Sequence, residues 1–304
     1  MQITQQMMVN QFLYNITNEN TTMQNLEDEL STGKVLNLPQ DNPLAVSQDM
    51  SARATLSSAQ GYQNTLQSAL TWMNNTSSAL SQIVNTLQSI QSYVMEGLNT
   101  TNQTTSDKNA LSETVQQLSK TIYQELDTQQ GSRYLFGGAD PLQPPVTTST
   151  NNIGYTTSGN TAASMEMQIS AGISITVNVS ASQVMGTASG STTNLESTLN
   201  STISDLQNGN ITGLQTDLTN LQTGITQVVN INAELGSRIK RATAMQTQIS
   251  QYVTTVQNYK GDLEDANMAK VITQFNTDQG VFTAALKMGS EILLPSLVNY
   301  LPNG

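Results

Sequence analysis

One uninterrupted stretch decides the fold: residues 43–98 read PLAVSQDMSARATLSSAQGYQNTLQSALTWMNNTSSALSQIVNTLQSIQSYVMEGL. It opens on a proline, which suits the first turn of a helix, and contains no other. Its apolar residues recur every seven positions, as in helices that pack in bundles or coiled coils. A helix of this length spans roughly 84 Å and therefore needs other long helices beside it. The repeat runs in three rows: Ala59, Leu66, Met73, Leu80, Leu87 and Val94; Tyr62, Ala69, Thr76, Ile83 and Ile90; Leu70, Val84 and Leu98.

Two further segments supply such partners. Residues 107–130 carry apolar residues at helical spacing, and Ser106 or Asp107 is a suitable N-terminal cap. A second helical pattern runs from Ile211 towards Asp262, after an Asn-Gly-Asn turn. The sequence therefore predicts a mainly α-helical chain built as a long-helix, coiled-coil-like bundle.

Both chain ends carry a narrow apolar seam of their own, typical of an amphipathic helix that packs on one partner. That partner is either the other end or a neighbouring subunit. Because an isolated helix is marginally stable in water, we expect both ends to be largely mobile in the free subunit and to pair as a coiled coil on assembly. The residues expected to carry assembly are Val9, Ile16, Met23, Leu30, Met268, Ile272, Phe275, Phe282, Leu286, Leu293, Leu297 and Tyr300.

The sequence pattern changes between the helices, over residues 131–194. This segment contains Gly and Pro breakers, followed by odd-numbered apolar residues from Met165 to Val179, the period of a half-buried strand. Pairing Ile169 with Ile173 would leave a three-residue turn, Ser170-Ala171-Gly172, with the glycine left-handed. The prediction is a small β-rich insert in a helical bundle. The expected organisation is a terminal assembly region (1–40 and 265–304), a helical bundle (41–130 and 195–264) and the insert (131–194).

Composition excludes several kinds of function. The net charge is −11 and the isoelectric point is about 4.3, which disfavours binding to nucleic acid. The chain has no Cys and no His, so thiolate chemistry, zinc ribbons and the commonest general base are unavailable. The most apolar run, residues 292–298, is far shorter than the roughly 20 residues of a membrane span. We expect no enzyme activity, no cofactor and no metal.

Three local features invite a chemical interpretation, each with a simpler alternative. The acidic residues Asp262, Glu264 and Asp265 could hold a cation, but negative charge near the start of the last helix is the better interpretation. Residues 131–138 are glycine-rich yet lack the lysine of a phosphate-binding loop, so a connection from helix to strand is favoured. The basic residues around Arg238 are most simply a solvated helix face.

Six stretches together resemble one family, the bacterial flagellins and hook-associated proteins. Pro43, where flagellins usually carry alanine, and the ending Tyr300-Leu301 resemble the hook-associated members more than flagellin itself. Each motif alone is weak, whereas their order along the chain is specific. The stretches are LSTGK (30–34), PQDNP (39–43), YLFGG (134–138), LGSR (235–238), LEDANMA (263–269) and SLVNYL (296–301).

The resemblance implies a structural role in the flagellum, at the junction where the hook meets the filament. It implies hook-associated protein 1, flagellin and copies of the chain itself in a ring as partners, and a cytoplasmic chaperone before export. It also implies type III export without a cleavable signal peptide, and an extracellular location.

Other functions stay open on the sequence alone. The chain could be a short flagellin, the filament subunit itself. It could also be a secreted coiled-coil adhesin or effector whose insert binds a ligand, although that function does not require matched seams at both ends. An enzyme is the weakest alternative, because no pair of nucleophile and base can be assembled.

Overall fold

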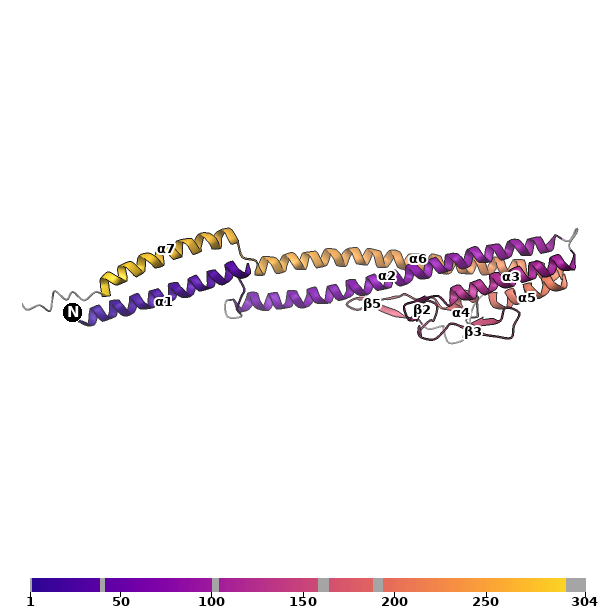
Figure 1. Ribbon diagram of the computed structural model, residues 1–304, viewed down its shortest axis with the longest axis horizontal. Helices are drawn as coiled ribbons and strands as arrows, with labels where there is room; N and C mark the ends of the chain where they lie inside the picture. Colours follow the sequence, from indigo (N-terminus) through magenta and orange to yellow (C-terminus); the bar gives the residue numbers. More distant parts are fainter. Residues whose placement is uncertain (1, 39–41, 100–103, 158–163, 188–193, 294–304) are drawn as a thin grey trace, which may run out of the picture. The chain divides into compact units, whose positions relative to one another are not determined.

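The computed structural model describes residues 2–38, 42–99, 104–157, 164–187 and 194–293. Of the described residues, 76% are helical, which confirms the predicted fold class of long helices from both ends with a small strand-containing insert. It divides into two compact units (Figure 1). The first unit contains residues 1–58 and 253–304, and the second contains residues 59–252.

Two long helices form the frame of the second unit, and both extend into the first. Helix α2 is Pro43–Leu98 and helix α6 is Ile211–Glu264. Within the second unit they lie side by side and antiparallel, since polar side chains bond across them from both ends. Four of these hydrogen bonds join Gln63 to Ser250, Gln67 to Gln246, Ser77 to Asn232 and Gln91 to Gln222.

The first two heptad rows predicted for α2 are confirmed as its buried face, whereas in the third row only Leu70 is buried and Val84 and Leu98 are half-buried. Leu66, Met73, Leu80, Leu87 and Val94 are all 0% exposed. The second row is buried as well, apart from the half-buried Tyr62. The partners on α6 follow the same spacing, and the fully buried ones are Leu221, Val228, Leu235 and Ala242.

Two shorter helices pack together beside this frame. Helix α3 is Thr105–Leu126 and helix α5 is Leu195–Asn208. The cap of α3 is Thr104, whose hydroxyl accepts from the Asp107 backbone amide, so the predicted caps Ser106 and Asp107 are wrong. Thr104 is preferred because Asp107 then lies three residues on and closes a capping box.

The described residues of the insert form three two-stranded antiparallel sheets and one short helix. Gly131 turns with a φ of 66° between the first two strands, so the glycine-rich stretch is a connection from helix to strand, as predicted. The structure shows this β-rich character, while its independence as a domain stays a prediction. The elements are β1 (Gln129–Gln130), β2 (Arg133–Tyr134), β3 (Val146–Thr148), β4 (Tyr155–Thr157), β5 (Glu166–Ser170), β6 (Ile173–Thr176) and α4 (Ala181–Met185).

The predicted register of the last hairpin is wrong by one residue. Ser170, not Ile169, pairs with Ile173, and the turn contains only Ala171 and Gly172. A bulge between Gln168 and Ser170 takes up the extra residue, which leaves Ile169 fully buried and Ile173 43% exposed. The positive φ expected for Gly172 is confirmed, at 72°.

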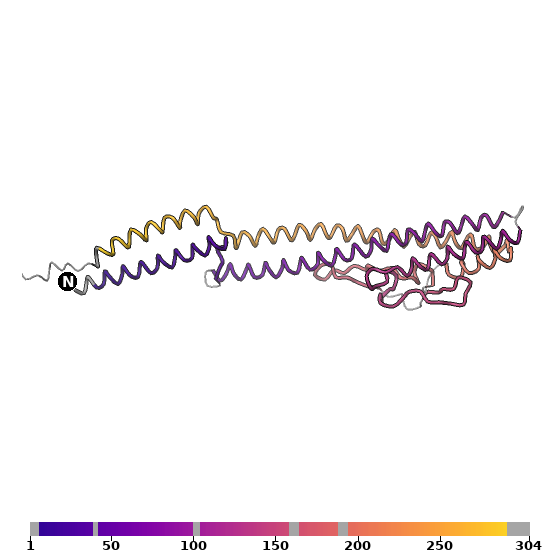
Figure 2. The backbone as a smooth tube through the Cα atoms, in the orientation of Figure 1, coloured from indigo at the N-terminus to yellow at the C-terminus, as the bar shows by residue number. Residues whose placement is uncertain are grey.

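The first unit pairs the two ends of the chain. Helix α1 is Gln2–Thr32 and helix α7 is Met268–Leu293, and they pack antiparallel (Figure 2). The same unit holds the first turns of α2 and the last turns of α6. Over the part of the chain that the structure describes, no helix has the length and apolar character to cross a membrane.

Candidate assembly site at the terminal helices

Helix α1 turns one half-buried face towards α7. Leu26 is its best-buried member, at 8% exposure. The alternating spacing of three and four residues is that of a helix that packs along a single partner. All four assembly residues predicted on α1 lie on this face, which consists of Val9, Phe12, Ile16, Glu19, Met23, Leu26 and Leu30.

The matching face of α7 contains two of the predicted residues, Phe275 and Phe282, both half-buried. Met268, Ile272 and Leu286 are 39%, 48% and 47% exposed, so they lie outside this face. The side chain of Leu293, together with Leu297 and Tyr300, lies outside the described residues. The part that these residues take in assembly therefore stays a prediction.

Sequence reasoning missed the rest of the α7 face: Val271, Asp278, Ala285 and Gly289. Three of these are small or charged and give no hydrophobic signal, although all fall at heptad spacing from the two phenylalanines. Gly289 has a packing role, because a Cβ there would lie 2.1 Å from the Phe12 ring. The ring of Phe12 thus occupies the space that a side chain at position 289 would fill.

A short backbone ladder joins the segment after α1 to the segment before α7. The Val35 amide donates to the Glu264 carbonyl at 2.7 Å, and the Ala266 amide donates to the Gly33 carbonyl at 2.9 Å. Gly33 has a φ of 71°, which lets α1 end and the chain turn away. Two of the stretches that resemble the flagellin family, 30–34 and 263–269, therefore lie next to each other.

The carboxylate of Glu264 lies at the centre of this junction. It is bonded by the Lys34 ammonium at 2.8 Å, the Arg53 guanidinium at 2.5 Å and the Lys260 ammonium at 3.3 Å. Arg53 also donates to Asp49 at 2.6 Å. The three cations come from the loop after α1, from α2 and from α6, so one side chain connects three segments.

The environment of Glu264 favours its ionised form. Burial opposes ionisation, but the hydrogen bonds from Lys34 and Lys260 and the charge of Arg53 outweigh it and lower the pKa of Glu264 to about 2. Glu264 is also the last residue of α6. The predicted role of this charge at the start of a helix is therefore wrong, because a helix end disfavours a carboxylate that has no cations around it.

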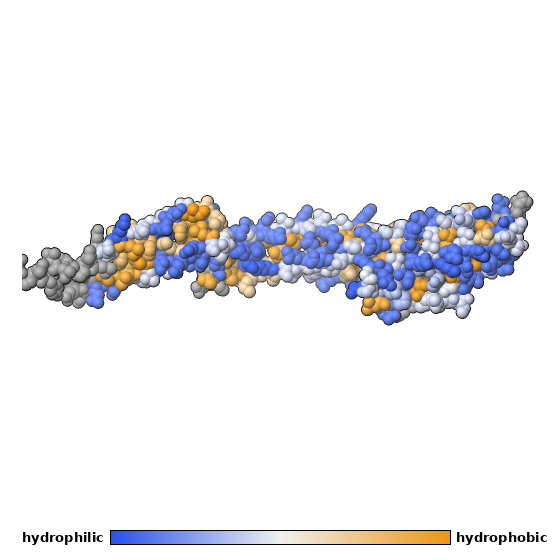
Figure 3. All heavy atoms as spheres, viewed as in Figure 1, coloured by the Kyte–Doolittle hydropathy of each residue, from blue (hydrophilic) through white to orange (hydrophobic). Residues whose placement is uncertain are grey.

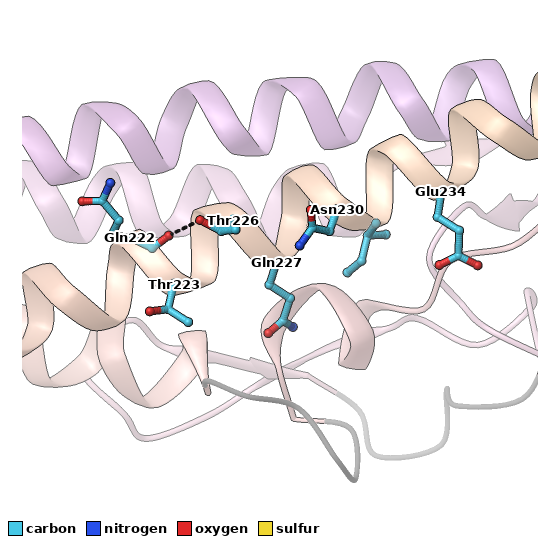
Figure 4. Close-up of a pocket in the computed structure, with 7 residues that line it drawn as sticks. Gln222, Thr223, Thr226, Gln227, Asn230 and Glu234 are labelled. Carbon is cyan, nitrogen blue, oxygen red and sulfur yellow. Dashed lines mark hydrogen bonds between the residues drawn. The ribbon is translucent and has the colours of Figure 1, made fainter.

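Within the described ranges, no group of three or more acidic residues could hold a metal ion. A pocket of about 430 Å³ in the second unit is lined by seven residues of α6, mostly amides and hydroxyls (Figure 4). Its one carboxylate, Glu234, is bonded by Arg238 at 2.6 Å and is not positioned as a general base.

Hydrophobic side chains gather over α1 and α7, whereas the second unit is largely covered by hydrophilic residues (Figure 3). The exposed apolar residues of the terminal pair include Met7, Met8, Leu13, Val281 and Met288, each at least 50% exposed. An apolar surface of this kind marks an interaction site in a protein that is otherwise polar.

Comparison with known proteins agrees with this picture. Residues 3–140 match the model of the bacterial flagellin N-terminal helical region. Among curated protein sequences, none matches the chain. A solved structure assigned as a flagellar hook-associated protein of Vibrio parahaemolyticus superposes with a TM-score of 0.65 at 18% identity, covering 74% of this chain and all of that one.

This is the fold of the flagellar hook-associated proteins. The resemblance to the flagellin-like family inferred from the sequence is thereby confirmed. FlgL of Bacillus cereus gives a TM-score of 0.57 at 16% identity, over 69% of this chain and 99% of that one. The flagellar junction protein FlgL of Legionella pneumophila also gives 0.57, at 12% identity, over 71% and 99% of the two chains.

Proposed function

We propose that this chain is a structural subunit of the bacterial flagellum that acts as hook-associated protein 3, at the junction between hook and filament. The observation that supports this most is the pairing of α1 with α7, which brings both chain ends into one helix pair with a half-buried seam and exposed apolar residues. A pair of this kind is stabilised when equivalent pairs pack around it. The hook-associated fold agrees with this role.

The proposal includes partners and a place of action. The chain joins hook-associated protein 1 on one side to flagellin on the other, as a ring of identical subunits. It is kept by a chaperone in the cytoplasm and exported to the outside of the cell. Catalysis forms no part of this proposal.

A second candidate function is a filament subunit, because residues 3–140 match the flagellin N-terminal region. The two functions differ in copy number and position. A junction protein forms one ring at the tip of each hook, whereas a filament subunit is found along the whole filament.

Deleting the gene tests the proposal. We expect cells that retain hooks, lack filaments and release unpolymerised flagellin into the medium, with filaments restored by the gene on a plasmid. An antibody against this chain should label a single band at the end of each hook. Labelling along the filament would support the filament subunit instead, and normal filaments in the deletion strain would contradict both functions.

A further inference from the structure

A groove in the first unit lies beside the end of α1. It has a volume of about 310 Å³ and is lined by Asn25, Asp28, Glu29, Val35, Asn37 and Leu38. Two carboxylates and two amides form its polar part. The apolar part is Val35 and Leu38, whose residues are 44% and 47% exposed.

The wall of this groove is already formed in the single subunit. The Thr32 hydroxyl bonds to the Asn37 amide oxygen at 2.9 Å, and the Asn37 amide nitrogen donates to the Lys34 carbonyl at 3.0 Å. The Lys34 amide donates back to the Thr32 hydroxyl at 3.2 Å. Because these bonds hold the loop against α1, a ligand would not have to order it on binding.

The carboxylates of the groove lack a cation. Neither Asp28 nor Glu29 has an ion pair with any described residue. Lys34 is the one Lys or Arg among residues 1–52, and its ammonium is bonded to Glu264 at 2.8 Å. An acidic groove with apolar sides is complementary to a lysine that carries apolar neighbours.

We propose that this groove receives Lys287 of a second copy of the chain, with Leu286 and Met288 of that copy against Val35 and Leu38. This deepens the proposed function and depends on it, because it names a contact between subunits of the ring. Residues 2–32 contain four acidic residues and no Lys or Arg, whereas α7 contains two lysines, Lys270 and Lys287. Both lysines are exposed.

The surroundings of the two lysines distinguish them. Lys287 is flanked around its helix by Leu286 and Met288, which are 47% and 62% exposed. Lys270 is instead followed by Val271, which is only 4% exposed because it faces α1. Lys287 therefore has an exposed large apolar residue directly on each side, whereas the exposed large apolar residues nearest to Lys270, Met268 and Ile272, are two positions away.

Disulfide trapping tests this contact, since the chain has no cysteine of its own. Val35→Cys and Met288→Cys are introduced together, and flagella are isolated from the cells under mild oxidation. Within one chain these positions are separated by most of α7, about 30 Å of helix. A disulfide requires Cα atoms within about 7 Å, so any bond must link two copies. We expect a ladder of linked dimers and higher species.

The matched control is Val35→Cys with Val281→Cys, which places the second cysteine two turns away on an equally exposed residue of α7. It should give at least fivefold less linked product. Adding Asp28→Lys to the first pair should reduce linking by a similar factor. Adding Lys287→Glu as well should restore it, whereas Lys270→Glu in its place should not.

The outcomes separate this contact from the proposed function. If the cysteine variant is present in the flagella but is not linked, or is linked equally in the control pair, the groove contact is wrong while the junction role stands. If neither the variant nor the unmodified chain is found in flagella, both proposals are wrong.

Discussion

The second unit and the terminal helix pair use the same heptad spacing with opposite results. On α2 the repeat is fully buried, since residues such as Leu66 and Leu80 have no exposed surface. On α1 the corresponding residues are mostly half-buried, and residues such as Met7 remain 66% exposed. The difference lies in the number of partners: α2 packs in a unit that also contains α3, α5, α6 and the insert, while α1 has α7. One pattern therefore serves folding in one place and leaves a surface for assembly in the other.

The strongest test of this difference between the two regions is to remove the aromatic residues of the terminal helix pair. Phe275→Ser with Phe282→Ser should abolish assembly, because the α7 face loses its two largest apolar side chains. The melting temperature of the second unit should be nearly unchanged. The measurements are electron microscopy of cells for filaments and circular dichroism of the purified chain. Normal filaments, or a large drop in that melting temperature, would contradict the prediction.

A substitution in the core of the second unit should instead lower the stability of that unit. Leu80→Ala removes a fully buried side chain and should lower the unfolding free energy of the second unit by about 2–5 kcal/mol, from lost burial and a cavity. Met23→Ala in the half-buried face of α1 should lower it by less than about 0.5 kcal/mol. Urea unfolding of both variants checks this, and equal losses would mean that the two regions are not energetically distinct.

A substitution of Glu264 tests how far the junction stabilises the first unit. Glu264→Gln should destabilise the first unit by about 1–3 kcal/mol, because it leaves three partly exposed cations without their carboxylate. The pKa of Glu264 is lowered to about 2 in the folded chain, from an unfolded value of about 4.3. Its contribution is therefore complete above about pH 4.5 and is lost as the pH falls towards 2. Hydrogen exchange of the backbone amides around residues 33–35 measures this loss of stability. Glu234→Gln, on the exposed face of α6, is the control.

The last substitution should increase stability. Asp217 is 4% exposed, and one of its carboxylate oxygens has no hydrogen bond, while the other accepts from Ser201 at 2.7 Å. Burial, together with the charge of Asp205, raises the pKa of Asp217 against the opposing bond from Ser201. Its ionisation thus reduces stability as the pH rises through the folded pKa. Asp217→Asn should stabilise the second unit at neutral pH by about 1 kcal/mol in urea unfolding, with less gain in acid.

The sequence predicts those parts of the fold that repeat. Helix α2 begins at Pro43 and ends at Leu98 as expected, because a proline opens it and one continuous period fills it. The face of α7 is less predictable, since Asp278, Ala285 and Gly289 look like surface positions until α1 is placed against them. The Glu264 junction is not predictable from local pattern at all. Its partner Arg53 is 211 residues away, and only the chain fold brings the two charges together.

The contact between α2 and α6 has a consequence for the media in which the protein can work. Within the second unit, pairs of amide and hydroxyl groups such as Gln67 with Gln246 and Ser77 with Asn232 bond across this contact, and none of these groups carries a formal charge. The ion pair of Arg53 with Glu264 lies in the first unit. Dissolved ions screen interactions between charges and leave bonds between neutral groups almost unaffected. Within the second unit, these bonds between the two helices should therefore be as strong in sea water as in fresh water.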